Sequence, residues 1–175
     1  DLGATSPFFY AFRKREMILR FFEKLTGQRM MYNYFAFGGV RRDIDYLDDV
    51  EEILNILPEK LEDYRKLISE NPIFIQRTEK KGILDSETAL DYAITGVNLR
   101  SSGFCLDTRL QDNLYKGFDI GIVIKEEKDS LARYQARIDE IKESMSIIKQ
   151  ALDVIKSHPN LEQKLINPIT LKLPE

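Results

Sequence analysis

Few side chains in this sequence could carry out chemistry by themselves. The 175 residues include one cysteine, Cys105, and one histidine, His158. One thiol and one imidazole are too few for the zinc and iron–sulfur sites that proteins usually build. No basic residue adjoins Cys105 to activate its thiol, so we expect a buried structural cysteine. The sequence therefore predicts no metal site within the chain.

An acidic run, DDVEE at residues 48–52, is the other group of side chains that could take part in chemistry. Paired carboxylates can act as acid and base, but negative charge also stabilises the first turn of a helix. We favour the helical interpretation. The sequence has no Gly-rich phosphate loop and no nucleophile elbow. Catalysis through a familiar local motif is therefore not expected.

The composition excludes several classes of protein. Lys and Arg number 26 against 29 Asp and Glu, so the net charge is −3, and this balance argues against a nucleic-acid partner. Hydrophobic residues make up 43%, a share typical of a folded globular chain. No apolar run reaches the ~18 residues of a membrane span, and no basic and apolar leader is present. We expect a soluble, cytoplasmic domain, and a first residue other than Met suggests a piece of a longer protein.

The first part of the chain is expected to form a long amphipathic helix. Ser6 as N-cap and Pro7 at the first helical position predict its start. Gly27 predicts its end. Residues 28–43 follow no helical period, so we expect an ordered loop or a short strand there.

A second helix is expected over residues 45–69, where apolar side chains keep a spacing of three and four. Pro58 lies inside this run and predicts a kink or two helices end to end. Asn71-Pro72 should end the helix, because a residue before proline is disfavoured in the helical region.

The middle of the chain has weaker patterns. A short helix is expected from Ser86 to Ile94, entered by Asp85 or Ser86 and stopped by Gly96. Residues 100–125 are irregular, and the stretch 117–124 resembles one strand.

The clearest element is the last helix, with apolar residues from Leu131 to Ile155 in a heptad pattern. We favour a core helix of a bundle over an intermolecular coiled coil, because at least two other amphipathic helices are available to pack against it. Residues 1–156 should form a single helical domain, and 157–175, with three prolines, an extended tail.

Several phrases of the sequence resemble, in the same order, one protein family: the D-type subunit of respiratory complex I, called the 49-kDa subunit in mitochondria. The resemblance extends from residue 1 to about 156. It rests on residues 1–10 (DLGATSPFFY), 27–34 (GQRMMYNY), 38–40 (GGV), 71–74 (NPIF), 99–103 (LRSSG), 106–109 (LDTR) and 129–134 (DSLARY).

This resemblance implies a mainly α-helical fold, a bundle of the type found in the large subunit of nickel–iron hydrogenases, with irregular loops and little strand. It also implies a peripheral-arm subunit of a proton-translocating NADH:quinone oxidoreductase, in which the chain helps to form the quinone chamber. The terminal [4Fe–4S] cluster would be held by a small neighbouring subunit, and quinone would be the substrate. The isolated chain should bind no NADH, metal or flavin and should be inactive.

The resemblance also implies candidate site residues. Asp1 falls on a family aspartate that hydrogen-bonds a histidine thought to protonate the quinone, and such a carboxylate would orient the imidazole and raise its basicity. That histidine and its partner tyrosine belong to an earlier part of the family's chain, so His158 matches neither. Phe8 and Phe9 match aromatic residues beside the quinone chamber, although aromatic residues at this spacing are also common in helix cores.

Met31 departs from much of the family, in which a histidine close to the terminal cluster is frequent. A thioether cannot bind a proton, which is compatible with a quinone of lower potential such as menaquinone. The implied partners are the cluster-bearing small subunit and a membrane-arm subunit, on the cytoplasmic side of the cell membrane. The alternative is a purely structural or interaction module of a hydrogenase-like or ferredoxin-linked complex, with no quinone role.

Overall fold

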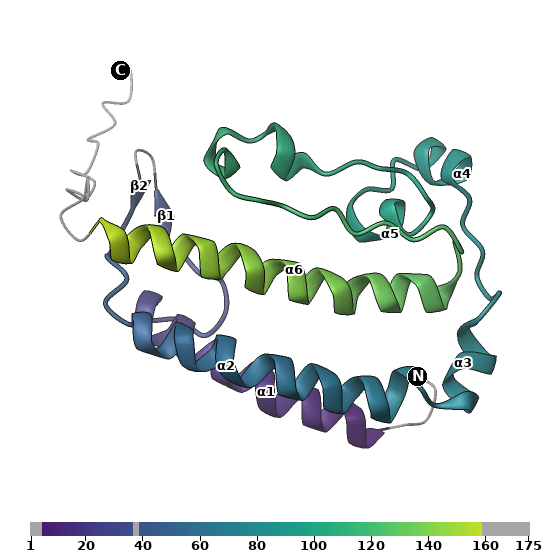
Figure 1. Cartoon of the computed structure of the whole chain (residues 1–175), viewed down its shortest axis with the longest axis horizontal. Helices are drawn as coiled ribbons and strands as arrows, with labels where there is room; N and C mark the ends of the chain where they lie inside the picture. The colour runs from purple at the N-terminus through teal and green to yellow at the C-terminus, as the bar shows by residue number, and fades with distance from the viewer. Residues whose placement is uncertain (1–4, 37–38, 159–175) are drawn as a thin grey trace, which may run out of the picture.

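The computed structural model describes residues 5–36 and 39–158, and this part of the chain is mainly helical with one small hairpin (Figure 1). The mainly α-helical prediction is confirmed. The elements are α1 (Thr5–Thr26), β1 (Phe35–Ala36), β2 (Gly39–Val40), α2 (Leu47–Tyr64), the π-helix η1 (Arg65–Ser69), α3 (Pro72–Thr78), α4 (Ser86–Asp91), α5 (Gly96–Arg100), the 3-10 helices η2 (Thr108–Gln111) and η3 (Asn113–Tyr115), and α6 (Ser130–Ser157).

The long helix α6 runs through the middle of the molecule (Figure 1). On one side it faces α1 and α2, which lie side by side, and on the other side it faces α4, α5 and the irregular segment that follows them. None of the described helices combines the length and the apolar character needed to cross a bilayer.

Helix α1 begins earlier than its capping residues predict. Ser6, expected as the N-cap, lies inside the helix, and Pro7 is in the first turn of α1 as described, where its missing N–H costs no intrahelical bond. The predicted end is confirmed. Gly27 adopts a left-handed φ of +79°, and its N–H donates to the carbonyl oxygen of Glu23 at 2.8 Å.

The second helix is interrupted at a different place from the one expected. Helix α2 continues through Pro58 as one α-helix, so the alternative of two helices that meet at the proline is wrong, and the kink stays a prediction. The hydrogen-bond pattern changes instead at the π-helix Arg65–Ser69. Asn71-Pro72 does end this helical run, and it also starts α3, because the Asn71 side chain accepts from the N–H of Ile73 at 2.9 Å.

Residues 28–43 contain the only strands among the described residues. β1 and β2 pair antiparallel, with Phe35 opposite Val40, which agrees with the predicted loop or short strand. Helix α4 starts at the expected place, capped by Asp85, but ends at Asp91 rather than Ile94. Gly96, expected as a stop, is instead the first residue of α5.

The predicted strand over 117–124 is wrong. Residues 117–124 form no strand, and side chains of α6 instead bond backbone groups of Asp119 and Gly121. The Asp119 N–H donates to Gln150 Oε1 at 2.8 Å, and Gln150 Nε2 donates back to the Asp119 carbonyl at 2.9 Å. The Gly121 N–H donates to Glu143 at 2.6 Å. Cys105, in the same irregular segment, is exposed rather than buried.

Helix α6 begins at a buried cap. One carboxylate oxygen of Asp129 accepts from the N–H of Ala132 at 2.8 Å, and the other accepts from the N–H of Lys80 at 2.7 Å. The first half of the helix packs tightly, with Ala132 and Ala136 fully buried. His158 caps its C-terminal end. Of the expected tail, 157–175, residues 159–175 lie outside the described residues.

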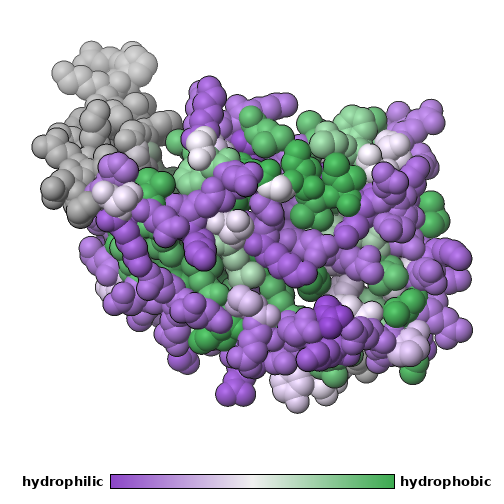
Figure 2. Space-filling model, viewed as in Figure 1, coloured by the Kyte–Doolittle hydropathy of each residue, from purple (hydrophilic) through white to green (hydrophobic). Residues whose placement is uncertain are grey.

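The apolar seam of α6 is less covered in its second half than a core helix would be. Ile141 is 38% exposed and Ile148 is 42% exposed. Both line an apolar cavity of about 230 Å³ between α1, α2 and α6, together with residues such as Phe22 and Leu54. Figure 2 shows apolar surface between α6 and α2 on this side of the molecule. The apolar seam of α6 faces α1 and α2 as expected, but these helices leave its second half partly exposed to solvent.

Candidate functional site

The N-terminal half of α1 carries aromatic side chains on its surface, which we call the aromatic cluster (Phe8, Phe9 and Phe12). Phe8 is 55% exposed and Phe9 is 65% exposed. Within the cluster, the Phe8 ring contacts Phe12 with centroids 4.4 Å apart and Phe9 with centroids 5.7 Å apart. The Arg15 guanidinium lies 5.6 Å from the Phe12 centroid. These rings therefore contact one another while leaving much of their apolar surface open to a ligand or a neighbouring protein.

Met31 lies just beyond the other end of α1. It is 90% exposed, and its φ of +58° places a non-glycine residue in the left-handed region. The following residue is well held, since the Tyr32 ring stacks on Phe22 with centroids 4.1 Å apart. Arg29 fixes the preceding turn through two hydrogen bonds to Glu16, at 2.9 and 2.6 Å. The thioether of Met31 is therefore presented to the surroundings from an ordered turn.

Glu16 is the charged anchor of this turn. Arg29 and, more weakly, Arg20 donate to its carboxylate, and the Arg29 hydrogen bond is the main cause that lowers the pKa of Glu16. The carboxylate stays ionised and its charge is matched by the two guanidinium groups. The anchor lies on the surface of α1, so it fixes geometry more than it contributes stability.

The structure does not bring the candidate residues together. Phe8 and the last residue of α1 are 18 positions apart, which at 1.5 Å per residue is about 27 Å of helix. The aromatic cluster and Met31 therefore belong to two separate surfaces at opposite ends of α1. Asp1, the third candidate, lies outside the described residues.

Elsewhere, a network of buried and half-buried charged groups joins the segment after α5 to α6. Arg100 donates to Glu140 at 2.5 Å and lies 3.4 Å from Asp107. Arg109 donates to Asp107 at 2.5 Å and to Glu140 at 3.2 Å. Two guanidinium groups and two carboxylates thus compensate one another in the interior.

This network links an irregular loop to a regular helix. Arg100 also donates to the carbonyl oxygen of Leu106 at 3.2 Å, and Asp107 accepts from the N–H of Arg109 at 3.0 Å. The Arg109 hydrogen bonds are the main cause that lowers the pKa of Asp107, so its carboxylate stays charged. The Nε atom of Arg100 is buried without a hydrogen-bond partner among the described residues.

Sequence reasoning assigned no role to these four residues. Arg100, Asp107 and Arg109 lie in phrases shared with the resembled family, but Glu140 is 31 to 40 positions further along a different element. The Asp-x-Arg spacing of 107–109 was the available signal, because the two side chains of such a turn can pair locally. Among residues 5–36 and 39–158, no three metal-binding side chains gather into a group that could hold an ion.

Comparison with known proteins gives a consistent result. The family model described as "Respiratory-chain NADH dehydrogenase, 49 Kd subunit" matches residues 1–171. The chain is similar to the H-type subunit of the chloroplast NAD(P)H-quinone oxidoreductase of Acorus calamus, with 44% identity over 175 residues, covering 97% of this chain and 44% of the relative. It is 46% identical over 173 residues to the corresponding chloroplast protein of Cryptomeria japonica, covering 95% of this chain and 44% of that protein.

A cyanobacterial relative is equally similar. An H-type subunit of the NAD(P)H-quinone oxidoreductase of Gloeobacter violaceus is 44% identical over 173 residues, with 95% of this chain and 44% of the relative covered. The chain therefore spans a little under half the length of the relatives it matches. Because the family model matches nearly the whole sequence, the chain belongs to the family of the 49-kDa subunit of the respiratory-chain NADH dehydrogenase.

Proposed function

We propose that this chain forms part of the quinone-binding surface of an NAD(P)H–quinone oxidoreductase, as the peripheral-arm subunit of the 49-kDa family. The observation that carries the proposal is the aromatic cluster. Phe8 and Phe9 stay more than half exposed on a well-formed helix, and they follow Asp1 closely in the sequence. An apolar, flat-ringed ligand such as a quinone head group is a suitable partner for exposed aromatic rings.

Asp1 would act on the quinone indirectly, as a positioning residue. A carboxylate that accepts from one nitrogen of a histidine fixes the tautomer and stabilises the imidazolium. The histidine could then supply a proton as the quinone is reduced. In this proposal the histidine belongs to a part of the complete subunit outside this sequence.

Met31 would take a different place, facing the neighbouring subunit that holds the terminal [4Fe–4S] cluster. The separation of about 27 Å along α1 makes one head group in contact with both Phe8 and Met31 implausible, so two surfaces are needed. The exposure of Met31 and the ordered turn that presents it fit a contact with another protein.

The wider assembly completes the proposal. The complex would pass electrons from NADH to quinone and couple this to proton translocation by a membrane arm, with this chain held peripherally on the cytoplasmic side of the cell membrane. Its helices would form part of a bundle of the hydrogenase large-subunit type. The chain would bind no metal, flavin or nucleotide of its own.

A purely structural role is the alternative. The same exposure of Phe8, Phe9 and Met31 would serve a subunit that only packs against its neighbours in a hydrogenase-like or ferredoxin-linked complex. The two functions differ in whether a charge at Asp1 matters for quinone reduction.

The test uses Asp1→Asn in the complete subunit, assembled in its complex. This change keeps the size of the side chain and removes the charge, so quinone reduction should fall by about tenfold to a hundredfold. Electron transfer from NADH to an artificial acceptor that takes electrons at the flavin should stay near the parent rate. Asp153→Asn, which removes an exposed carboxylate from α6, is the matched control and should change neither rate.

Each other result counts against the proposal. If both rates of Asp1→Asn equal those of the parent, the alternative gains and Asp1 has no part in quinone reduction. If both rates fall together, the proton-positioning role is overturned in favour of a role in assembly.

A further inference from the structure

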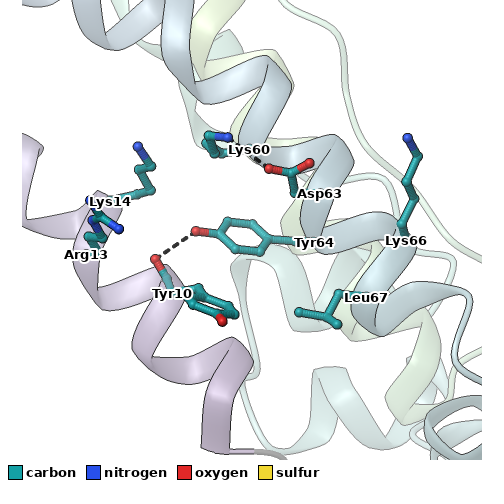
Figure 3. A pocket seen from close by; sticks show the side chains of 8 residues that line it. All are labelled: Tyr10, Arg13, Lys14, Lys60, Asp63, Tyr64, Lys66 and Leu67. Atoms are coloured by element: carbon teal, nitrogen blue, oxygen red, sulfur yellow. Dashed lines mark hydrogen bonds and ion pairs between the residues drawn. The ribbon is translucent and has the colours of Figure 1, made fainter.

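A cavity lies between α1 and the end of the α2–η1 run, and neither the aromatic cluster nor Met31 lines it. Its volume is about 670 Å³, within the range of small-molecule sites in proteins. Figure 3 shows Tyr10, Arg13 and Lys14 reaching it from α1, with Lys60 and Tyr64 opposite. The Tyr64 hydroxyl donates to the Tyr10 carbonyl oxygen at 2.9 Å and joins the two walls.

The lining carries an excess of positive charge. Its eight residues include four cations and one carboxylate, in a chain whose net charge is −3. The lining cations are Arg13, Lys14, Lys60 and Lys66, and the carboxylate is Asp63.

These cations differ in how far they are already neutralised. Lys60 pairs with Glu59 at 2.7 Å and with Asp63 at 2.9 Å. Lys66 is only within 3.9 Å of Glu62. Arg13 and Lys14 have no ion-pair partner among the described residues. Two cations on α1 therefore line the cavity without an ion-pair partner among the described residues.

The other walls suit the organic part of a ligand. Leu67 and the ring of Tyr10 are apolar surfaces at the base of the cavity (Figure 3). Burial is the main cause that raises the pKa of Tyr64, so its phenol keeps its proton and adds no negative charge. The cavity thus offers apolar surface beside its cations, as sites for amphipathic molecules do.

No residue of the aromatic cluster lines this cavity. At about 100° per residue, Tyr10 and Lys14 point roughly 120–160° away from Phe8 and Phe12 around the helix axis, whereas Arg13 lies one turn after Phe9. A ligand in the cavity therefore need not contact Phe8. The inference is tested by anion binding rather than by quinone reduction, so its failure can be distinguished from failure of the quinone proposal.

We propose that this cavity binds a phosphate-bearing anion. Among the described residues, Arg13 and Lys14 leave two positive charges at the cavity without a carboxylate partner, and a phosphate group carries up to about two negative charges at neutral pH. The Arg13 guanidinium can hold two phosphate oxygens, and the lysine ammonium groups supply further charge-assisted hydrogen bonds. The phosphate could be free, as in a small diphosphate, or belong to the head group of an anionic lipid whose acyl portion lies along Leu67.

The first experiment titrates the full-length subunit with pyrophosphate and follows binding by calorimetry. Arg13→Gln combined with Lys14→Gln should weaken the affinity by about tenfold or more, because two charge-assisted contacts are lost. Lys116→Gln combined with Lys149→Gln is the matched control, since it removes the same charge from exposed positions outside the cavity. The control should change the affinity by less than about twofold.

A second experiment distinguishes the two sources of phosphate. The same variants are added to vesicles of phosphatidylglycerol and to vesicles of phosphatidylcholine, and sedimentation measures the bound fraction. Loss of phosphatidylglycerol binding in the Arg13/Lys14 variant alone supports a lipid head group, and loss of pyrophosphate binding alone supports a soluble phosphate.

Two results would overturn the proposal. One is a parent protein that binds neither pyrophosphate nor phosphatidylglycerol vesicles, which would leave the cavity to an acidic segment of a neighbouring protein. The other is an equal loss in the cavity variant and in the control, which would assign the binding to net charge. Arg13 is exposed and Lys14 is half-buried, and circular dichroism melts confirm that the variants remain folded.

Discussion

Helix α1 and the segment from α5 to α6 use similar residue types in opposite ways. α1 leaves its aromatic rings exposed at one end and presents Met31 beyond the other, and its ion pairs with Arg29 lie on the surface. The segment from α5 to α6 buries Arg100 and Asp107 and compensates their charges internally. The N-terminal end of α1 exposes apolar rings to solvent, whereas the segment from α5 to α6 holds charged side chains away from solvent.

This difference separates two kinds of sequence phrase that the chain shares with its family. The phrase at 99–109 builds an internal network that holds an irregular loop against α6. The phrase at 1–10 includes Phe8 and Phe9, which contribute little to the described packing. The first kind is explained by the folding of this chain, whereas the second kind needs a ligand or a partner to explain it.

The largest expected effect is on the buried network. Asp107→Asn leaves Arg100 and Arg109 with one carboxylate between them, and removal of one partner of a buried ion pair costs about 3–5 kcal/mol. We expect the free energy of unfolding of the 175-residue chain to fall by that amount, measured by urea denaturation. Asp153→Asn, at an exposed position, should stay within about 0.5 kcal/mol of the parent. Equal effects of the two changes would break the contrast between buried and exposed regions.

The same carboxylate predicts the direction of a pH effect. Hydrogen bonds from Arg109 lower the pKa of folded Asp107, so its contribution to stability is complete above the unfolded-state pKa of about 4. That contribution is lost as the pH falls through the lower folded-state pKa. The parent should therefore lose more stability than Asp107→Asn on acidification below about pH 4, and the difference between them should be constant from about pH 6 to 8. A difference that varies across the neutral range would assign the effect to another group.

A smaller effect is expected at the seam of α6. Ile141→Asp would place a charge in a fully packed core if the seam were closed, at a cost of several kcal/mol. Ile141 is 38% exposed beside a cavity, so we expect a loss of about 1–2 kcal/mol. Ala136→Asp, at a fully buried position on the same helix, should destabilise the chain much more. Similar losses for the two variants would show that the seam is closed in solution.

Local signals predicted the elements well. The left-handed Gly27 and the capping side chain of Asp85 act within one turn of the chain, so the sequence window contains the whole interaction. The strand expected over 117–124 failed for the opposite reason. The hydrogen-bond partners of its backbone are the side chains of Glu143 and Gln150, which lie more than twenty residues further on, and no local pattern identifies them.

How much of the candidate site could be predicted from the sequence differs from one residue to the next. Resemblance located Phe8, Phe9 and Met31, but only the fold shows that α1 separates them. The heptad pattern of α6 identified the apolar side of the helix. The pattern cannot show how much of that side is covered by α1 and α2, because coverage depends on how the helices pack. The partnership of Glu140 with Arg100 likewise depends on packing between distant elements.

The exposed end of α1 can be tested without disturbing the fold. Phe9→Ala removes a ring that is mostly exposed, so the free energy of unfolding should change by less than about 0.5 kcal/mol. In the assembled complex, quinone reduction should fall about threefold to tenfold, because an apolar contact with the head group is lost. Tyr92→Ala, at another exposed aromatic position, should leave the rate unchanged. If Phe9→Ala strongly lowered the free energy of unfolding, the aromatic cluster would belong to the packed core. The contrast between this exposed end of α1 and the buried network would then not hold.

The smallest effect is expected at Met31. Met31→His restores a group that can bind a proton, and histidine tolerates the left-handed φ of +58°. If this side chain faces the cluster of a neighbouring subunit, reduction of the cluster adds negative charge and raises the pKa of the new imidazole. The midpoint potential should then decrease with rising pH between the two pKa values, with a slope of up to about 59 mV per pH unit, whereas the parent potential should be flat. Quinone reduction at neutral pH should change by less than about twofold. Met30→His, one position earlier and also exposed, is the control, and a slope as steep there as in Met31→His would mean that the turn does not present one side chain to the cluster.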